Sequence, residues 1–152
     1  MAIAPNTTFV SGAVLTAAQQ NAFGFGIVAY QTATANDSFT VEEVEITSTT
    51  FTAIANRYYR IMYFEPNLNN GVDANVTQTI RLTNLAGAIQ GSSFVFCRAG
   101  GFSSSGMLIA YSTFAAGSTV LVATLTSSTG TSTATRTANF KGILSVEDVG
   151  PA

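Results

Sequence analysis

The sequence has no histidine, no tryptophan and a single cysteine, Cys97. Without histidine and with one thiol, the chain cannot build Ser-His-Asp or Cys-His nucleophilic sites, nor zinc sites made from histidines or several cysteines. One thiol also excludes a disulfide within the chain. Charged residues make up only 9% of the 152 residues, against roughly 25% in an average soluble domain. These absences exclude several large classes of enzyme and every disulfide framework.

Positive charge is particularly scarce. Six Lys and Arg against eight Asp and Glu give a net charge of −2, so no basic field exists to bind nucleic acid or an anionic membrane surface. A membrane-spanning helix needs roughly 20 consecutive apolar residues, and the best stretch, residues 22–30, is far shorter and contains Gly24 and Gly26. No positively charged segment precedes an apolar core at the N-terminus, so we expect no secretory signal. Neither nucleic acid nor a membrane is expected as a partner.

Apolar and hydroxyl side chains dominate what is present. Hydrophobic residues account for 47% of the chain, and the polar residues include 22 Thr and 14 Ser. A monomer of this size leaves about a third of its unfolded-chain surface exposed, and so few charges are too few to cover that surface in the usual way. Obligate interfaces resemble a core cut in half. The composition therefore predicts an obligate oligomer.

The first 24 residues differ from the rest of the chain. Residues 2–10 show neither the helical nor the strand periodicity of hydrophobic residues, and they are predicted to form an extended arm. Thr16 with Gln19 three residues later forms a capping box, which predicts a helix of at most two turns that ends at Gly24. We therefore divide the chain into an N-terminal arm and short helix (1–24) and a jelly-roll β domain (25–152).

From residue 25 onward the chain consists of short runs rich in Thr, Val, Ile, Phe and Tyr, separated by turn residues. About eight to ten such runs predict an all-β protein, an antiparallel β-sandwich or jelly roll. In the run 39–47 the alternation changes phase at Glu42 and Glu43, which predicts a β-bulge. Pro66 is predicted to end the run 58–65, and residues 67–71 to form a turn. The predicted strands are 26–33, 39–47, 50–55, 58–65, 75–84, 92–98, 107–114, 118–126, 131–137 and 141–149.

In two runs, 107–111 and 120–123, both the odd and the even positions are apolar, so both faces of the predicted strand are apolar. In a β-sandwich exposed to water, each strand carries polar residues on its solvent-facing side. These runs therefore favour a sheet whose outer side packs on a neighbouring subunit, as in a compact jelly-roll trimer. Tyr58 and Tyr59, in an apolar run, are predicted as core or interface aromatics rather than as stacking platforms. Cys97 is predicted to be a small buried hydrophobic residue.

Glu42, Glu43 and Glu45 are the densest charges in the sequence. Paired carboxylates perform acid–base chemistry in glycosidases, but here they sit in one predicted strand. We favour a solvated strand face, or pairing between subunits with Arg57 or Arg60, and we predict no catalytic residues.

Other acidic residues are candidate calcium ligands. Asp37, Asp73 and the pair Glu147 and Asp148 supply suitable oxygen atoms, but none lies in a densely acidic loop. Turn closure is the favoured role for Asp37 and Asp73. We predict neither a metal nor a cofactor.

The two ends of the sequence together resemble virion proteins of tailed bacteriophages. Residues 6–21, NTTFVSGAVLTAAQQN, are similar to an N-terminal arm and helix of the pattern G-x-V-L-T-A-A-Q-x-N, and residues 143–150, ILSVEDVG, are similar to an L-x-V-E-D-I/V-G ending. Residues 52–64 resemble a strand of compact trimeric jelly rolls of the tumour-necrosis-factor and C1q shape.

This resemblance implies a trimeric capsid decoration protein on the virion, with itself and the major capsid protein or other virion proteins as partners. The arm and helix would bind the capsid through five apolar anchors: Phe9, Val10, Val14, Leu15 and Phe23. The alternative is a tail-fibre or receptor-binding tip that binds a host ligand through loops 66–74 and 99–106. A polysaccharide-cleaving enzyme that uses Glu42, Glu43 or Glu45 is a third hypothesis.

Overall fold

The computed structural model describes residues 23–152. Every regular element in this range is a β-strand, and none of it is a helix long and apolar enough to cross a membrane. The arm and most of the helix that the sequence predicts therefore lie outside the described residues. The strands are β1 (Gly26–Ala33), β2 (Asp37–Phe39), β3 (Glu43–Thr47), β4 (Phe51–Ala53), β5 (Arg57–Asn70), β6 (Ala74–Leu82), β7 (Ile89–Cys97), β8 (Ser104–Ser112), β9 (Gly117–Thr119), β10 (Leu121–Ser127), β11 (Ser132–Ala134) and β12 (Gly142–Pro151).

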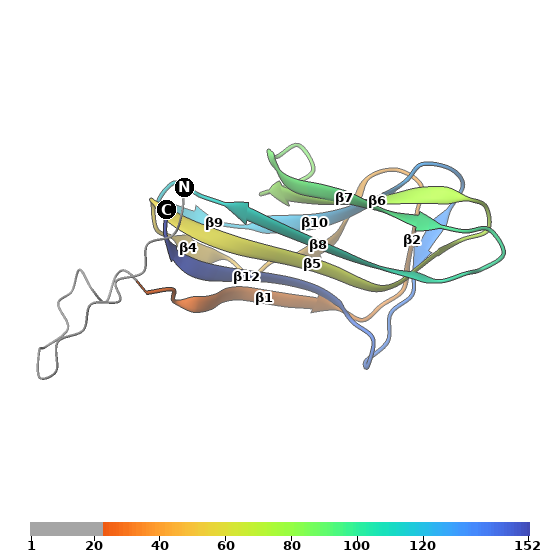
Figure 1. Cartoon of the computed structure of the whole chain (residues 1–152), viewed down its shortest axis with the longest axis horizontal. Coiled ribbons are helices and arrows are strands. Elements are labelled where there is room, and N and C mark those ends of the chain that lie inside the picture. The colour runs from red at the N-terminus through yellow and green to blue at the C-terminus, as the bar shows by residue number, and fades with distance from the viewer. Residues whose placement is uncertain (1–22) are drawn as a thin grey trace, which may run out of the picture.

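These strands form two main antiparallel sheets packed face to face (Figure 1). The first has the order β1-β12-β5-β11-β2, and β8 pairs with the other side of the long strand β5. The second has the order β3-β10-β6-β7, and β4 and β9 form a separate pair. The predicted all-β sandwich is confirmed, with more strands than the sequence suggested.

The core lies between the two sheets and follows from the alternation of the strands. On β5, Tyr59, Ile61 and Tyr63 point inward while the residues between them point outward. Each fully buried side chain of this size contributes about 1.5–3 kcal/mol relative to exposure. Inward residues of the other strands complete the core, among them Phe39, Ile46, Val76, Ile80, Leu121, Leu125, Leu144 and Val146.

The chain changes sheet between β2 and β3, where the sequence predicted one continuous strand. Phe39 belongs to the first sheet and Glu43 to the second, so the predicted strand 39–47 is wrong. The phase change at Glu42 and Glu43 marks this crossover rather than a bulge. The register does shift one step later: Ala123 pairs with Ile46 and Thr124 with Val44, which leaves Glu45 as the extra residue. An irregularity of this kind turns a side chain away from its alternating position.

Strand β5 continues through Pro66, which the sequence predicted to be its end. The pairing of β5 with β8 shifts between Glu65 and Leu68, and proline is tolerated at such irregularities because no ladder hydrogen bond is required of it. Leu68 is fully buried, so the predicted turn over residues 67–71 is wrong as well. The chain reverses direction only after Asn70, and the side-chain oxygen of Asn70 accepts a hydrogen bond from the Val72 amide.

Candidate functional site

Of the five predicted anchors, Phe9, Val10, Val14 and Leu15 lie outside the described residues. Phe23 is described and is 42% exposed. Its carbonyl accepts a hydrogen bond from the Arg57 guanidinium at the start of β5. The segment that leads from the predicted arm therefore meets the sandwich at the end where β5 begins and β12 finishes.

Arg57 organises this end of the molecule. Its guanidinium donates two hydrogen bonds to Asp148 on β12, at 2.6 and 2.7 Å, and both side chains are buried. The ring of Phe25 lies 4.3 Å from the guanidinium carbon, in cation–π geometry. A Cβ on Gly24 would stand 2.7 Å from the Asp148 carbonyl oxygen, so the chain passes close to β12 here. Arg57 is thus occupied within its own chain, and so is Arg60, which pairs with Glu147.

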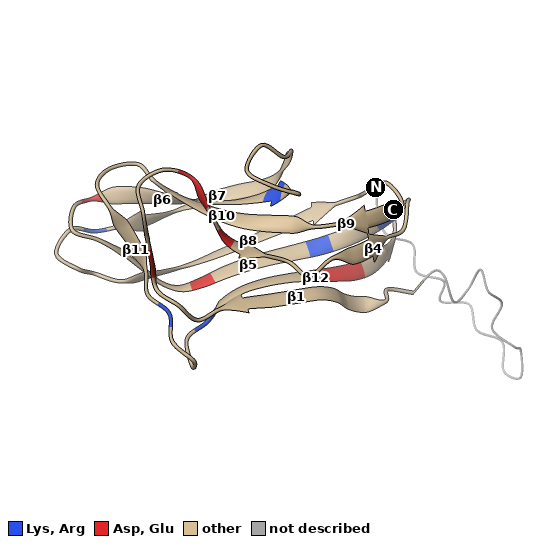
Figure 2. Cartoon of the chain, turned by 180° about the vertical axis from the view of Figure 1, so that it is seen from behind, with Lys and Arg blue, Asp and Glu red and all other residues tan. Residues whose placement is uncertain are grey.

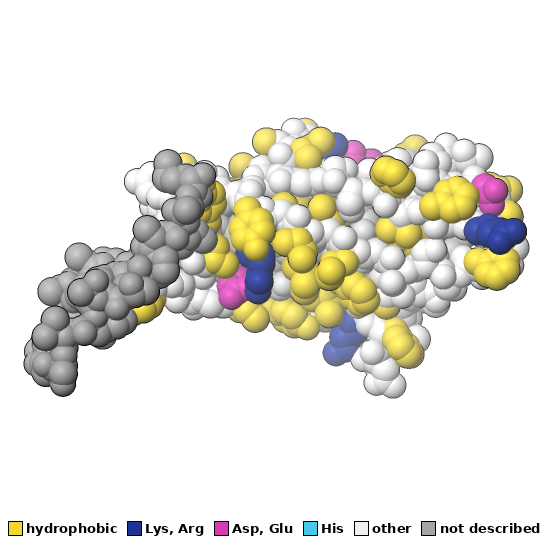
Figure 3. Space-filling model, viewed as in Figure 1, with side chains coloured by type: hydrophobic (Ala, Val, Ile, Leu, Met, Phe, Trp, Pro, Cys, Tyr) yellow, Lys and Arg dark blue, Asp and Glu magenta, His cyan; other side chains and the backbone are white. Residues whose placement is uncertain are grey.

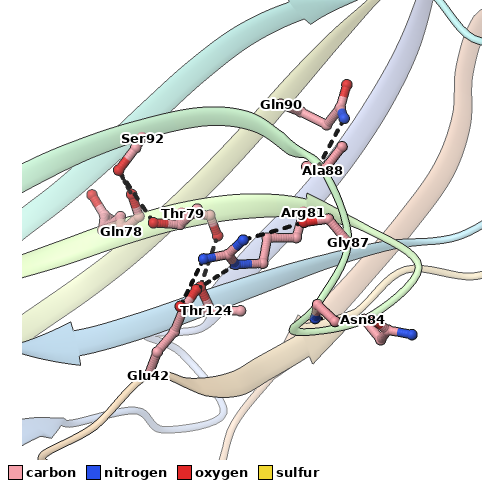
Figure 4. A network of polar contacts seen from close by, with 11 residues as sticks. Glu42, Gln78, Thr79, Arg81, Asn84, Gly87, Ala88, Gln90, Ser92 and Thr124 are labelled. Atoms are coloured by element: carbon pink, nitrogen blue, oxygen red, sulfur yellow. Dashed lines mark hydrogen bonds and ion pairs between the residues drawn. The ribbon is translucent and has the colours of Figure 1, made fainter.

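Glu42, at the end of the crossover, forms an ion pair with Arg81 of β6 and stays partly exposed. Arg81 donates from Nε and Nη2 to the two carboxylate oxygens at 2.6 and 2.8 Å, and the Thr124 hydroxyl donates to Oε1 at 2.7 Å (Figure 4). Arg81 also donates to the Gly87 carbonyl, so it holds the loop after β6 as well. The hydrogen bond from Arg81 lowers the pKa of Glu42 and keeps the carboxylate charged.

Glu45 is the more unusual carboxylate, because its side chain is fully buried. Arg136, which follows β11, donates to Glu45 Oε2 at 2.6 Å and to both oxygens of Glu65 on β5 at 2.6 and 2.9 Å. Tyr63 donates to Glu65 as well. Burial raises the pKa of Glu45 to about 7 although Arg136 opposes the shift. The expected solvated face is therefore wrong for Glu45. Both Glu42 and Glu45 pair with arginines other than Arg57 and Arg60, at positions far away in sequence.

The structure gathers three carboxylates that the sequence did not connect. Oxygens of Asp37, Glu43 and Glu45 lie within 4.8 Å of one another. Asp37 comes from the first sheet and the two glutamates from the second, and the crossover brings them together. Asp37 Oδ1 also accepts a hydrogen bond from the Ser38 amide. Figure 2 shows how sparse the remaining charges are along the strands.

Asp73 and Cys97 have simple environments. Asp73 does not close its own turn but accepts a hydrogen bond from the Ala99 amide at 2.6 Å, so it joins two loops. Cys97 is fully buried, as predicted, and burial raises the pKa of its thiol. Neither arrangement supplies a reactive group.

The outer face of the first sheet is largely apolar. Outward residues lie in register across β8, β5, β12 and β1, and we name this set the outer face. Only the ion pair between Arg60 and Glu147 interrupts it with charge, and hydrophobic side chains gather across its middle in Figure 3. Its rows are Met107, Phe64, Ile143 and Thr32; Ile109, Met62, Ser145 and Tyr30; and Tyr111, Arg60, Glu147 and Ile27.

The two predicted binding loops meet at the end of the sandwich opposite Phe23. The Asp73 to Ala99 hydrogen bond ties the turn after β5 to the loop after β7. In that loop Arg98 lies over the ring of Phe102 at 5.6 Å, and Phe102 is 61% exposed. Residues 66–70 belong to β5, so the first loop is shorter than the predicted 66–74.

No protein-family model matches the chain, and no curated protein matches its sequence. Similar solved structures include the CBM22-1 xylan-binding domain from Paenibacillus barcinonensis Xyn10C, with 10% identity, a TM-score of 0.37, and coverage of 86% of this chain and 98% of that chain. A chain of infectious bursal disease virus Gx strain has 12% identity and a TM-score of 0.33, over 81% of this chain and 42% of that one. The enzymatically active domain of bacteriophage CBA120 tailspike protein 4 has 14% identity and a TM-score of 0.28, over 86% and 19%. Because the likenesses are this weak, the sandwich architecture rests on the strand pairing described above.

Proposed function

We propose that this chain is a non-catalytic structural protein of a phage virion, which associates into a trimer through the outer face and decorates the capsid. The outer face carries this proposal. Met107, Ile109 and Tyr111 on β8 are between 47% and 59% exposed, beside half-buried Met62 and Phe64 on β5. Monomers rarely leave contiguous apolar patches of more than a few hundred Å² in water. Three copies of this face packed around a common threefold axis would remove these side chains from water, as obligate interfaces do.

The position of the outer face agrees with an attached, outward-facing body. The described chain starts at Phe23 beside Arg57, and β2 and β11 lie at the far end (Figure 1). Subunits joined side by side through β8, β5 and β12 would then carry their arms at one end and the loops of Asp73 and Phe102 at the other. Arms acting together gain avidity through effective concentration, and binding only to the assembled shell stabilises the shell by mass action.

The association is tested by substituting Ile109 with Glu at the centre of the outer face. We expect the wild type to sediment as a trimer and Ile109→Glu as a folded monomer. Phe102→Glu, on a hydrophobic residue at the far end that is even more exposed than Ile109, is the control and should remain a trimer. A monomeric wild type at micromolar concentration, or an Ile109→Glu protein of unchanged mass, would refute this interface.

Attachment is tested separately, with a chain that lacks residues 1–24. This truncated chain should remain a folded trimer but fail to bind virus particles. Full occupancy of particles by the truncated chain would remove the arm from the proposal. The number of copies per particle then distinguishes decoration, with hundreds of copies, from a fibre, with a handful.

A receptor-binding tip is the second candidate, because the structure brings the two predicted loops together. Phe102, stacked with Arg98, presents an exposed aromatic ring at that end, and such rings bind sugars and apolar groups through their faces. Phe102→Ala should abolish adsorption to host cells if this candidate is right and leave particle stability unchanged. Unaltered adsorption would favour decoration.

A further inference from the structure

The carboxylates of Asp37, Glu43 and Glu45 are placed as ligands of one ion would be. Their oxygens lie within 4.8 Å of one another. Two oxygens that bind the same calcium ion at 2.3–2.6 Å are separated by at most about 5 Å. The spacing therefore suits a shared cation without a change in the backbone.

Within residues 23–152, the groups that contact this cluster do not balance its charge. Arg136 donates to Glu45 and Glu65, so one guanidinium serves two buried carboxylates while Asp37 and Glu43 add two more. Like charges at this separation repel each other, and the repulsion is stronger where water is excluded. One guanidinium against four carboxylates leaves negative charge for a cation to neutralise.

A second observation, independent of the spacing, comes from Glu45. Its side chain is 0% exposed, and its Oε1 atom is buried without any hydrogen-bond partner, although Oε2 accepts from Arg136. Buried carboxylate oxygens without partners are rare because each loses its hydration without compensation. The extra residue in the register of β3 places this side chain in the interior beside Ile46.

We propose that Asp37, Glu43 and Glu45 bind a hard divalent cation, Ca²⁺ in particular, which ties β2 of the first sheet to β3 of the second. Carboxylate oxygens are the ligands that Ca²⁺ prefers. Asp37 is exposed and Glu43 half-buried, so water completes the coordination shell from the solvent side. The ion supplies Glu45 Oε1 with a partner and fixes the point at which the chain changes sheet. This inference is independent of the proposed role in a virion.

Thermal unfolding of the full chain at pH 8 in 1 mM CaCl₂ and in 1 mM EDTA tests the site. We expect CaCl₂ to raise the Tm by at least about 3 °C. Asp37→Asn and Glu43→Gln should each lose most of that increase. In EDTA the same variants should be at least as stable as wild type, because one repelling carboxylate is gone. Asp73→Asn, at an exposed carboxylate outside the outer face and outside the cluster, is the matched control and should keep the full increase.

Terbium luminescence gives a readout that does not depend on stability. The chain has no tryptophan, so sensitised emission must come from tyrosine, and Tyr63 contacts Glu65 beside the site. We expect the emission to saturate with terbium concentration and to fall when CaCl₂ displaces the bound terbium. In Glu43→Gln the affinity for terbium should be at least about tenfold weaker. A wild-type Tm insensitive to CaCl₂ would mean that a proton, not a cation, relieves Glu45. Equal terbium affinity in Glu43→Gln and Asp73→Asn would mean adventitious binding, and either result overturns the site.

Discussion

Replacing Arg136 with Met tests whether the buried charge cluster holds the two sheets together. Methionine fills a similar length of space but cannot donate hydrogen bonds. The substitution removes the donors to Glu45 on β3 and to Glu65 on β5, and also the donor to the Ala35 carbonyl. It leaves two buried carboxylates that face each other without a cation.

The structure sets the size of the expected effect. Arg136 and both glutamates have side chains that are at most 2% exposed, so solvent screening is small. Removing one partner of a buried ion pair costs about 3–5 kcal/mol, a large part of the roughly 5–15 kcal/mol by which a domain is stable. The exposed pair of Arg60 and Glu147 should contribute at most about 1 kcal/mol.

Urea unfolding of wild type, Arg136→Met and the control Arg60→Met at pH 8, at one protein concentration, measures both effects. We expect a loss of about 3–5 kcal/mol for Arg136→Met and about 1 kcal/mol or less for Arg60→Met. Burial raises the pKa of Glu45 to about 7, so at pH 5 this carboxyl is protonated and the penalty for Arg136→Met should shrink. Equal losses for the two variants, or a penalty for Arg136→Met that grows at low pH, would refute the reasoning.

Three further predictions follow from single contacts. Burial raises the pKa of Glu45 from 4.5 to about 7. In EDTA, the contribution of Glu45 to the free energy of unfolding is therefore largest below pH 4.5 and is lost as the pH rises through 7. In Glu45→Gln, a stability profile between pH 4.5 and 8 should lack this loss, which amounts to at most about 3 kcal/mol. Gly106→Ala should destabilise the fold by about 1–3 kcal/mol in chemical denaturation, because a Cβ there would stand 2.4 Å from Gln78 Oε1 and 2.8 Å from a Val95 methyl. Cys97 should react with a thiol reagent only in denaturant, and rapid labelling of the native protein would contradict its burial.

Much of the fold could be predicted where the residues alternate regularly. The run 26–33 matches β1, and Cys97 is buried, as its residue type predicts. Prediction failed where local signals had two meanings. Pro66 is typical of a strand end but is equally compatible with an irregular register, and the phase change at Glu42 is typical of a bulge but here marks a change of sheet.

The charged site could not be predicted, for a different reason. Arg136 lies 71 residues from Glu65 and 91 from Glu45, and nothing local in sequence pairs them. Asp37 and Glu43 are near in sequence, but they were assigned to a turn and to a solvated strand face. Only the position of the crossover, which depends on how the two sheets pack, shows that their carboxylates converge.

The distribution of charge links the composition to the proposed assembly. Arg57, Arg81 and Arg136 each bind a carboxylate within the chain, and Arg57 and Arg136 do so in the interior. These arginines join strands to one another, so they do not serve as surface charges that keep a protein apart from its neighbours. In a chain with only six cations, this use leaves the outer face with the single pair of Arg60 and Glu147 among apolar residues. The scarcity of charge therefore leaves a sheet face that agrees with the proposed contact with another subunit.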